Sequence, residues 1–205
     1  IVGDAFQFRG NPDDLVVVPP ATELSPEDGF TITAWVHPTA DAEMLIIGLW
    51  SNFEGRAYRV QIFPGMRLSL YIADDERQNN TAFHDFRTGP NALALDAWSM
   101  VAAVWDADAD ERRLYVNGAL VGRRKDPGVS VTRSAADLGI GALLTEPGLT
   151  WIPFHGRIDE ISLFEEALAE DEIERLYITV STPGPIGRRT ATPSTSPAAA
   201  TMDPW

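Results

Sequence analysis

The sequence predicts an all-β protein, an antiparallel β-sandwich with one short C-terminal helix and an extended tail. Short apolar runs, several alternating with polar residues, recur between turn-forming residues as far as residue 164. Strands and long helices do not alternate, so the pattern excludes a doubly wound parallel sheet. Apolar residues recur at helical spacing in residues 168–176, which are the predicted helix.

The predicted strands are short and follow one another closely. They comprise residues 6–8, 15–18, 30–36, 45–50, 58–63, 66–72, 98–105, 112–117, 120–123, 138–143 and 157–164. Residues 74–91 are expected to form a long exposed loop or a ragged edge strand. Asn117-Gly118 is a typical hairpin turn, because a type I′ turn needs positive φ at both central residues. In the run 30–36 the even-numbered residues share one face, and Trp35 lies on the other.

The composition changes close to the end of the predicted helix. We expect residues 1–177 to form one β-sandwich domain, and residues 178–205 to be a linker or tail rich in Pro, Ser and Thr. An ordered tail would hold neighbouring subunits, so residues 181–205 are a candidate assembly element. The chain begins at Ile1 without a signal sequence, which suggests an excised or processed piece of a larger protein.

The charge and the residue types exclude several classes of partner. The net charge is −14, so neither a nucleic acid nor an anionic membrane is an expected partner, because both need clustered Lys and Arg. The absence of Cys excludes disulfides and thiolate metal sites. No apolar run reaches the length of about 18 residues that spans a bilayer, so membrane insertion is not expected.

Four blocks of sequence, in a fixed order, carry a family resemblance. They read VGDAFQFRG at residues 2–10, FTITAWV at 30–36, WSMVAAVWD at 98–106 followed by RLYVNGALV at 113–121, and GRIDEISLF at 156–164. Together they resemble the laminin-G-like, concanavalin A-like lectin jelly-roll family over residues 2–177. The resemblance implies two antiparallel sheets packed face to face, one of them concave, in lectin-like, adhesive or particle-decorating modules.

The resemblance also implies a place for one structural Ca²⁺. Related sandwiches often hold calcium at the position of Asp159, with carbonyl oxygens from the first strand and from the loop before residue 30. Asp4 and Gly29 would supply those carbonyls here, and water would complete the hard oxygen ligands that calcium requires. The alternative is that Asp159 only accepts backbone N–H bonds at a strand end.

Aromatic rings near the concave face or its rim are the candidate ligand-binding residues, because exposed rings stack on sugars. The candidates are Trp50, Tyr58, Tyr71 and Trp151. Aromatic residues of a sandwich more often belong to its core, and this is the competing interpretation for each of them. Trp35, Trp98 and Trp105 are expected to be core residues.

Catalysis is not expected. A retaining glycosidase needs two carboxylates about 5 Å apart, but Asp159 and Glu160 lie on opposite faces of their strand, and neither face carries a second carboxylate. His37, His84 and His155 lack zinc-ligand spacing.

We therefore expect a non-catalytic binding module of an extracytoplasmic protein or particle, with lectin-like recognition of a glycan or cell-surface ligand. The alternative is a structural subunit of a capsid, filament or membrane complex, held to neighbouring proteins through the sandwich surface and the tail. A glycoside hydrolase is the third hypothesis.

Overall fold

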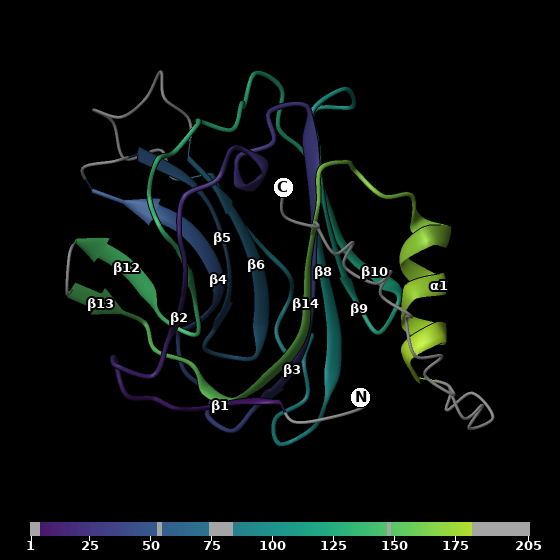
Figure 1. Ribbon diagram of the computed structural model, residues 1–205. Helices are drawn as coiled ribbons and strands as arrows, with labels where there is room; N and C mark the ends of the chain where they lie inside the picture. The colour runs from purple at the N-terminus through teal and green to yellow at the C-terminus, as the bar shows by residue number, and fades with distance from the viewer. Residues whose placement is uncertain (1–4, 53–54, 74–83, 147–148, 182–205) are drawn as a thin grey trace, which may run out of the picture.

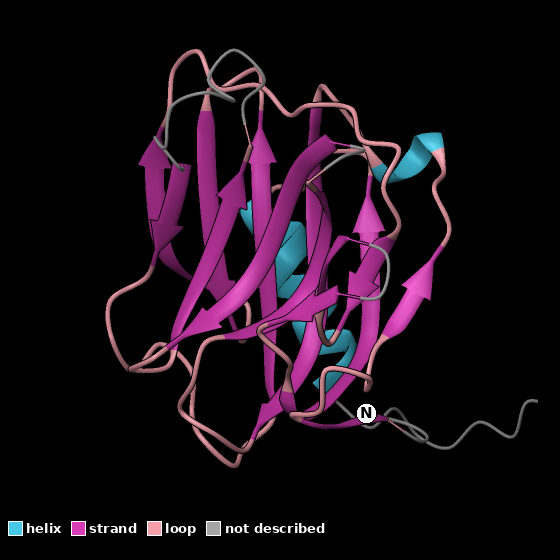
Figure 2. Ribbon diagram, turned by 90° about the vertical axis from the view of Figure 1, so that its left-hand side faces the viewer, coloured by secondary structure: helices cyan, strands magenta, loops and turns pink. Residues whose placement is uncertain are grey.

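The computed structural model describes residues 5–52, 55–73, 84–146 and 149–181 (Figure 1). These residues form two six-stranded antiparallel sheets, a two-stranded hairpin and helix α1 (Glu170–Ser181). The two sheets pack face to face, and α1 lies against the outer side of one of them (Figures 1 and 2). The predicted antiparallel sandwich with one short C-terminal helix is thus confirmed.

Each sheet combines a run of consecutive strands with strands that are distant in the sequence. The first sheet has the order β1 (Phe6–Arg9), β14 (His155–Phe164), β3 (Gly29–Pro38), β8 (Ser99–Asp106), β9 (Glu111–Val116) and β10 (Ala119–Lys125). The second has the order β2 (Val16–Val18), β11 (Leu138–Ile140), β4 (Met44–Ser51), β5 (Gly55–Phe63), β6 (Arg67–Ile72) and β7 (His84–Arg87). The hairpin of β12 (Leu143–Glu146) and β13 (Leu149–Trp151) lies beside the second sheet, and a 3₁₀ turn, η1 (Thr22–Leu24), precedes β3.

The core lies between the sheets and follows the two-residue repeat of the strands. Phe30, Ile32, Ala34 and Val36 of β3 all point into it. Trp35 points the other way, as predicted, and its ring stacks on Tyr177 of α1 with 6.0 Å between centroids. Burial of this apolar surface is the main force that holds the two sheets together.

Several local expectations are confirmed and others need correction. Asn117 and Gly118 have φ of 51° and 79°, as a type I′ turn requires. Trp98 is only half-buried, and its ring lies edge-on to His37. The expectation that Trp98 is a core residue is therefore wrong. Helix α1 continues to Ser181, so the predicted boundary at residue 177 falls inside the helix. The hairpin β12–β13 was not predicted.

Within the described ranges, no helix is both long enough and apolar enough to cross a membrane.

β10 lies at one edge of the first sheet, and its exposed end carries Arg123, Arg124 and Lys125. The tail residues 182–205, with most of the candidate assembly element, lie outside the described residues.

One ion pair is buried inside the sandwich. The side chain of Arg112 in β9 has no exposed surface, and that of Asp126 is 4% exposed. Arg112 Nε donates to Asp126 Oδ2 at 2.8 Å, and Nη1 donates to the carbonyl oxygen of Leu70 in β6 at 3.1 Å. Burial lowers the pKa of Arg112, and the hydrogen bond that Arg112 donates to Asp126 opposes that effect. The guanidinium therefore fastens the first sheet to the second.

We expect Asp126→Ala to reduce the free energy of unfolding by about 3–5 kcal/mol, because it leaves a buried charge without its partner. Urea unfolding followed by tryptophan fluorescence measures the change. The matched control is Asp171→Ala, which breaks an exposed ion pair with Arg175 on α1 and should cost about 0.5 kcal/mol or less. Equal effects of the two variants would contradict the fastening role.

Candidate functional site

The two outer faces of the sandwich differ in what covers them. Helix α1 covers the outer face of the first sheet, where Leu168 and Ile173 pack on Val104 and Tyr115. The hairpin β12–β13 covers part of the outer face of the second sheet, where Leu143 packs on a small apolar cluster. The candidate ligand surface is therefore the rest of the second sheet's outer face.

The strand repeat explains which residues reach this face. Val60 and Ile62 of β5, and Leu68 and Leu70 of β6, point into the core, so their sequence neighbours point outward. We call this surface the arginine face. It comprises Trp50 of β4, Arg56, Arg59 and Gln61 of β5, Arg67, Ser69 and Tyr71 of β6, and Asp85 and Arg87 of β7.

A β-bulge brings two of these arginines together. Arg56 and Arg59 are three residues apart, so in a regular strand they would point to opposite faces. The β4–β5 register shifts at this point, because Leu49 pairs with Tyr58 while the next residue, Trp50, pairs with Arg56. The extra residue on β5 leaves Ala57 and Tyr58 both in the core. Arg56 and Arg59 therefore share the outer face.

Both guanidinium groups lie against the same indole ring. Arg59 Cζ is 4.8 Å from the centroid of Trp50 and 4.5 Å from that of Tyr71. Arg56 Cζ is 5.1 Å from the Trp50 centroid, and its Nη2 donates to Asn52 Oδ1 at 2.8 Å. The Trp50 and Tyr71 rings meet edge-on, 5.0 Å apart. These distances are typical of cation–π contacts.

Burial governs the electrostatics of this cluster. Trp50 and Tyr71 are 5% and 3% exposed, whereas Arg56 and Arg59 are half-buried. Burial lowers the pKa of Arg59, and the positive charge of Arg56 adds to that effect, while Tyr71, Glu43 and Asp85 oppose it. Burial likewise raises the pKa of Tyr71 to about 12. A partly desolvated guanidinium interacts more strongly with an anion than one in water.

Several polar atoms of the arginine face lack a partner. Arg59 Nε, Arg67 Nε and Gln61 Oε1 are buried and form no hydrogen bond in the part of the chain that the structure describes. Asp85, by contrast, accepts from the Ser69 hydroxyl with one oxygen and pairs with Arg87 through the other. The negative charge of Asp85 is therefore paired with Arg87 and not with Arg56 or Arg59.

The structure places the predicted aromatic residues differently from one another. Trp50 and Tyr71 lie on the arginine face but beneath the arginines. Tyr58 has no exposed surface, and its hydroxyl donates to Leu24 O at 2.8 Å inside the molecule, so it cannot contact a ligand. Trp151 is 60% exposed. It pairs with Leu143, so both side chains lie on one face of the hairpin, the face that packs beside Trp50.

The residues present do not fit the predicted calcium site. Asp159 lies opposite Trp35, whereas Gly29 lies opposite Asp106 at the far end of β3. The six intervening steps correspond to about 20 Å of strand, so one ion cannot contact both. Asp159 Oδ1 accepts the N–H of Glu160 at 2.9 Å, within β14 rather than at a strand end. Asp4 lies outside the described residues, among which no three acidic or histidine side chains are grouped to hold a metal.

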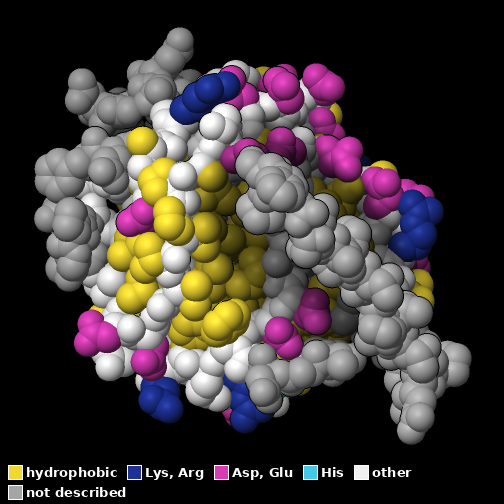
Figure 3. All heavy atoms as spheres, viewed as in Figure 1, with side chains coloured by type: hydrophobic (Ala, Val, Ile, Leu, Met, Phe, Trp, Pro, Cys, Tyr) yellow, Lys and Arg dark blue, Asp and Glu magenta, His cyan; other side chains and the backbone are white. Residues whose placement is uncertain are grey.

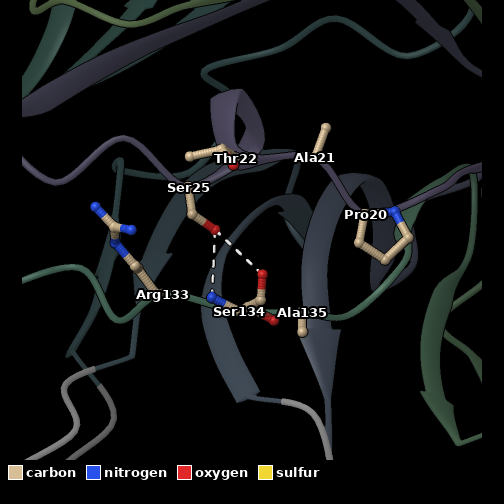
Figure 4. A pocket seen from close by; sticks show the side chains of 7 residues that line it. All are labelled: Pro20, Ala21, Thr22, Ser25, Arg133, Ser134 and Ala135. Atoms are coloured by element: carbon tan, nitrogen blue, oxygen red, sulfur yellow. Dashed lines mark hydrogen bonds between the residues drawn. The ribbon is translucent and has the colours of Figure 1, made fainter.

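A pocket of about 490 Å³ lies at the rim, between the loop that contains η1 and the loop before β11 (Figure 4). Its lining consists of Pro20, Ala21, Thr22, Ser25, Arg133, Ser134 and Ala135. Ser25 Oγ accepts from Ser134 N at 3.3 Å, and Ser134 Oγ donates to Gly55 O at 2.9 Å. Arg133 pairs with Glu27. These polar groups hold the loops to β5, and the lining contains no aromatic ring for stacking.

The family model described as the concanavalin A-like lectin/glucanases superfamily matches residues 9–174. The chain belongs to this superfamily. The match runs from the end of β1 through every later strand and into the first half of α1. It confirms the resemblance carried by the four sequence blocks. Nothing among the curated proteins matches the sequence.

Solved structures of low sequence identity share this concanavalin A-like fold. A SAP-like pentraxin from Limulus polyphemus is 16% identical with a TM-score of 0.63, over 83% of this chain and 80% of the pentraxin. The CBM40 domain of a Ruminococcus gnavus IT-sialidase, bound to α2,3-sialyllactose, is 14% identical with a TM-score of 0.64, over 80% and 96%. The Streptococcus pneumoniae sialidase NanB is 18% identical with a TM-score of 0.68, over 84% of this chain but 27% of the sialidase.

Sequence reasoning missed the arginines of this concanavalin A-like domain. Polar residues alternate with apolar ones in β5 and β6, so Arg59, Gln61, Arg67 and Ser69 could have been assigned to one outer face. Arg56 could not, because the bulge that turns it outward leaves no signal in the two-residue pattern. The search for aromatic platforms drew attention to Trp50 and Tyr71, which support the arginines from below.

We expect Tyr71→Phe to remove an alkaline titration step. The pKa of Tyr71 is raised to about 12, above the value of about 10 of an unfolded tyrosine. The stability linked to this phenol is therefore present below pH 10 and is lost as the pH rises to about 12. Absorbance titration should show a tyrosinate step near pH 12 that the variant lacks, with circular dichroism confirming that both stay folded. Loss of a step near pH 10 instead, at about the pKa of an unfolded tyrosine, would contradict the burial of this hydroxyl.

Proposed function

We propose that this domain is a non-catalytic carbohydrate-binding module whose ligand lies on the arginine face beside the hairpin β12–β13. The observation that carries the proposal is the exposed indole of Trp151 on the hairpin face shared with Leu143. Leu143 packs in one cluster with Trp50, the ring that lies against Arg56 and Arg59. A sugar ring has an apolar face that stacks on an aromatic side chain and hydroxyl groups that need donors and acceptors. Trp151 supplies the first, and Arg56 and Arg59 supply donors.

The comparisons support this proposal at the level of the fold. The superfamily includes lectins, and the similar CBM40 domain is described in complex with a sialylated trisaccharide. A binding module of this kind meets its glycans outside the cytoplasm, so the proposal includes an extracytoplasmic location. The assembly role of residues 181–205 stays a prediction.

The arrangement of carboxylates favours binding over hydrolysis. Glycoside hydrolysis needs one carboxylic acid to protonate the leaving group and a second carboxylate as nucleophile or base. On the arginine face, both oxygens of Asp85 are engaged by Ser69 and Arg87. Glu43 is exposed before β4 and accepts from Gln61 Nε2 at 3.4 Å. Asp85 is therefore not free to act as the acid or as the second carboxylate on this face.

We expect Trp151→Ala to weaken binding of the best ligand found on a glycan array about tenfold or more, because the stacking platform for the sugar ring is lost. Isothermal titration calorimetry measures the affinity. The matched control is Phe6→Ala, which removes another exposed ring, 54% exposed, from β1 of the first sheet.

A second control variant, Ala135→Trp, fills the rim pocket with a bulky side chain. Binding should be unchanged in this variant. If Ala135→Trp abolishes binding while Trp151→Ala leaves it intact, the ligand lies in the rim pocket and the proposed site is wrong.

A further inference from the structure

We propose that the arginine face selects saccharides that carry a carboxylate, and that Arg56 and Arg59 are the residues that bind it. This inference rests on the proposed carbohydrate-binding function and names the chemical class of its ligand.

The first argument is the absence of a protein counter-ion. Several other arginines have a carboxylate within 4 Å, including the pairs Arg112 with Asp126, Arg124 with Asp126, and Arg133 with Glu27. In the described part of the chain, neither Arg56 nor Arg59 forms such a pair. Two like charges against one indole ring repel each other, and the effect of Arg56 on the pKa of Arg59 reflects this. A bound anion would relieve the repulsion.

The second argument is the orientation that stacking imposes. A guanidinium that lies over an aromatic ring uses its flat face for the cation–π contact and keeps its N–H groups in the plane, at its edge. Arg59 Cζ lies within 5 Å of the centroids of both the Trp50 and Tyr71 rings. Glu43 and Asp85 act on Arg59 electrostatically, but neither forms an ion pair with it within 4 Å in the described part of the chain. A carboxylate is a planar acceptor with two oxygens, which matches the edge of a guanidinium.

The third argument is the distribution of charge over the whole molecule. The chain has a net charge of −14, and in the view of Figure 3 acidic side chains gather at the top and along the side of α1. A polyanion would be repelled from such a surface. A single carboxylate on a largely neutral saccharide feels mainly the local arginines, because charges beyond about 8 Å are screened at physiological salt.

The fourth argument is the bulge in β5. Without the extra residue, Arg56 would point into the core and only Arg59 would face outward. Bulges are common beside binding and active sites, where they re-aim a side chain. Here the bulge places the guanidinium of Arg56 beside that of Arg59. Arg56 is not part of the core, so core packing does not explain why position 56 is an arginine.

The experiment compares matched acidic and neutral ligands by isothermal titration calorimetry. The probes are sialyllactose and galacturonate, which carry one carboxylate each, the carboxyl methyl ester of each, lactose, and sulfated lactose. Each ester keeps the sugar rings and removes only the negative charge. We expect at least one acid to bind about tenfold or more tightly than its ester. Raising NaCl from about 0.05 to 0.5 M should weaken binding of the acid but leave the ester unaffected.

Substitutions test the residues directly. Arg56→Gln and Arg59→Gln should each weaken binding of the acid about tenfold and weaken binding of the ester much less, because the Gln amide still donates a hydrogen bond to a sugar hydroxyl. Arg59→Lys keeps the charge in case the Gln variant unfolds, and it should bind the acid with intermediate affinity because the planar fork is lost. The matched control is Arg175→Gln on the exposed surface of α1, which should change neither affinity.

The outcomes separate this inference from the proposed function. If the esters or lactose bind as tightly as the acids and Trp151→Ala still weakens binding, the carboxylate inference is overturned and the carbohydrate-binding function stands. If sulfated lactose binds more tightly than both acids and its binding depends on both arginines, the carboxylate inference is overturned, and the preferred ligand carries a sulfate. If none of the probes and no glycan on the array binds, the proposed function fails and this inference fails with it.

Discussion

The architecture of this domain depends on the two-residue repeat of its strands and on the one place in β5 where that repeat is interrupted. In β5 the repeat sends Val60 and Ile62 into the core and sends Arg59 and Gln61 to the surface. A slip of one residue would reverse both sets. The bulge at Ala57 and Tyr58 adds a residue without reversing the rest, so stability and a charged surface come from the same short strand.

The buried guanidinium of Arg112 connects this surface to the rest of the sandwich. It donates to the carbonyl oxygen of Leu70, which lies between Ser69 and Tyr71, two residues of the arginine face. The backbone of β6 is thus held from behind by β9, and the Tyr71 ring that supports Arg59 stands on a fixed strand. Sites built on such strands hold their side chains more accurately than sites built on loops.

Sequence patterns predicted the sheets well, because alternation and turn chemistry are local properties. They predicted the site less well, since the side of Trp50, the exposure of Trp151 and the distance from Asp159 to Gly29 depend on strand register, which is set by distant residues. Arg56 shows the same limit, because its side chain faces outward only through the bulge. The hairpin β12–β13 escaped detection because its strands of four and three residues are too short for a period to be visible.

The basic end of β10 has a consequence for copies of this domain that are crowded together. An edge strand exposes unpaired N–H and C=O groups that can pair with another chain. Here Arg123, Arg124 and Lys125 line that edge and form ion pairs with Glu111 and Asp126. A second strand docking on it would have to strip water from these charges. Crowding of copies should therefore not lead to aggregation through this edge.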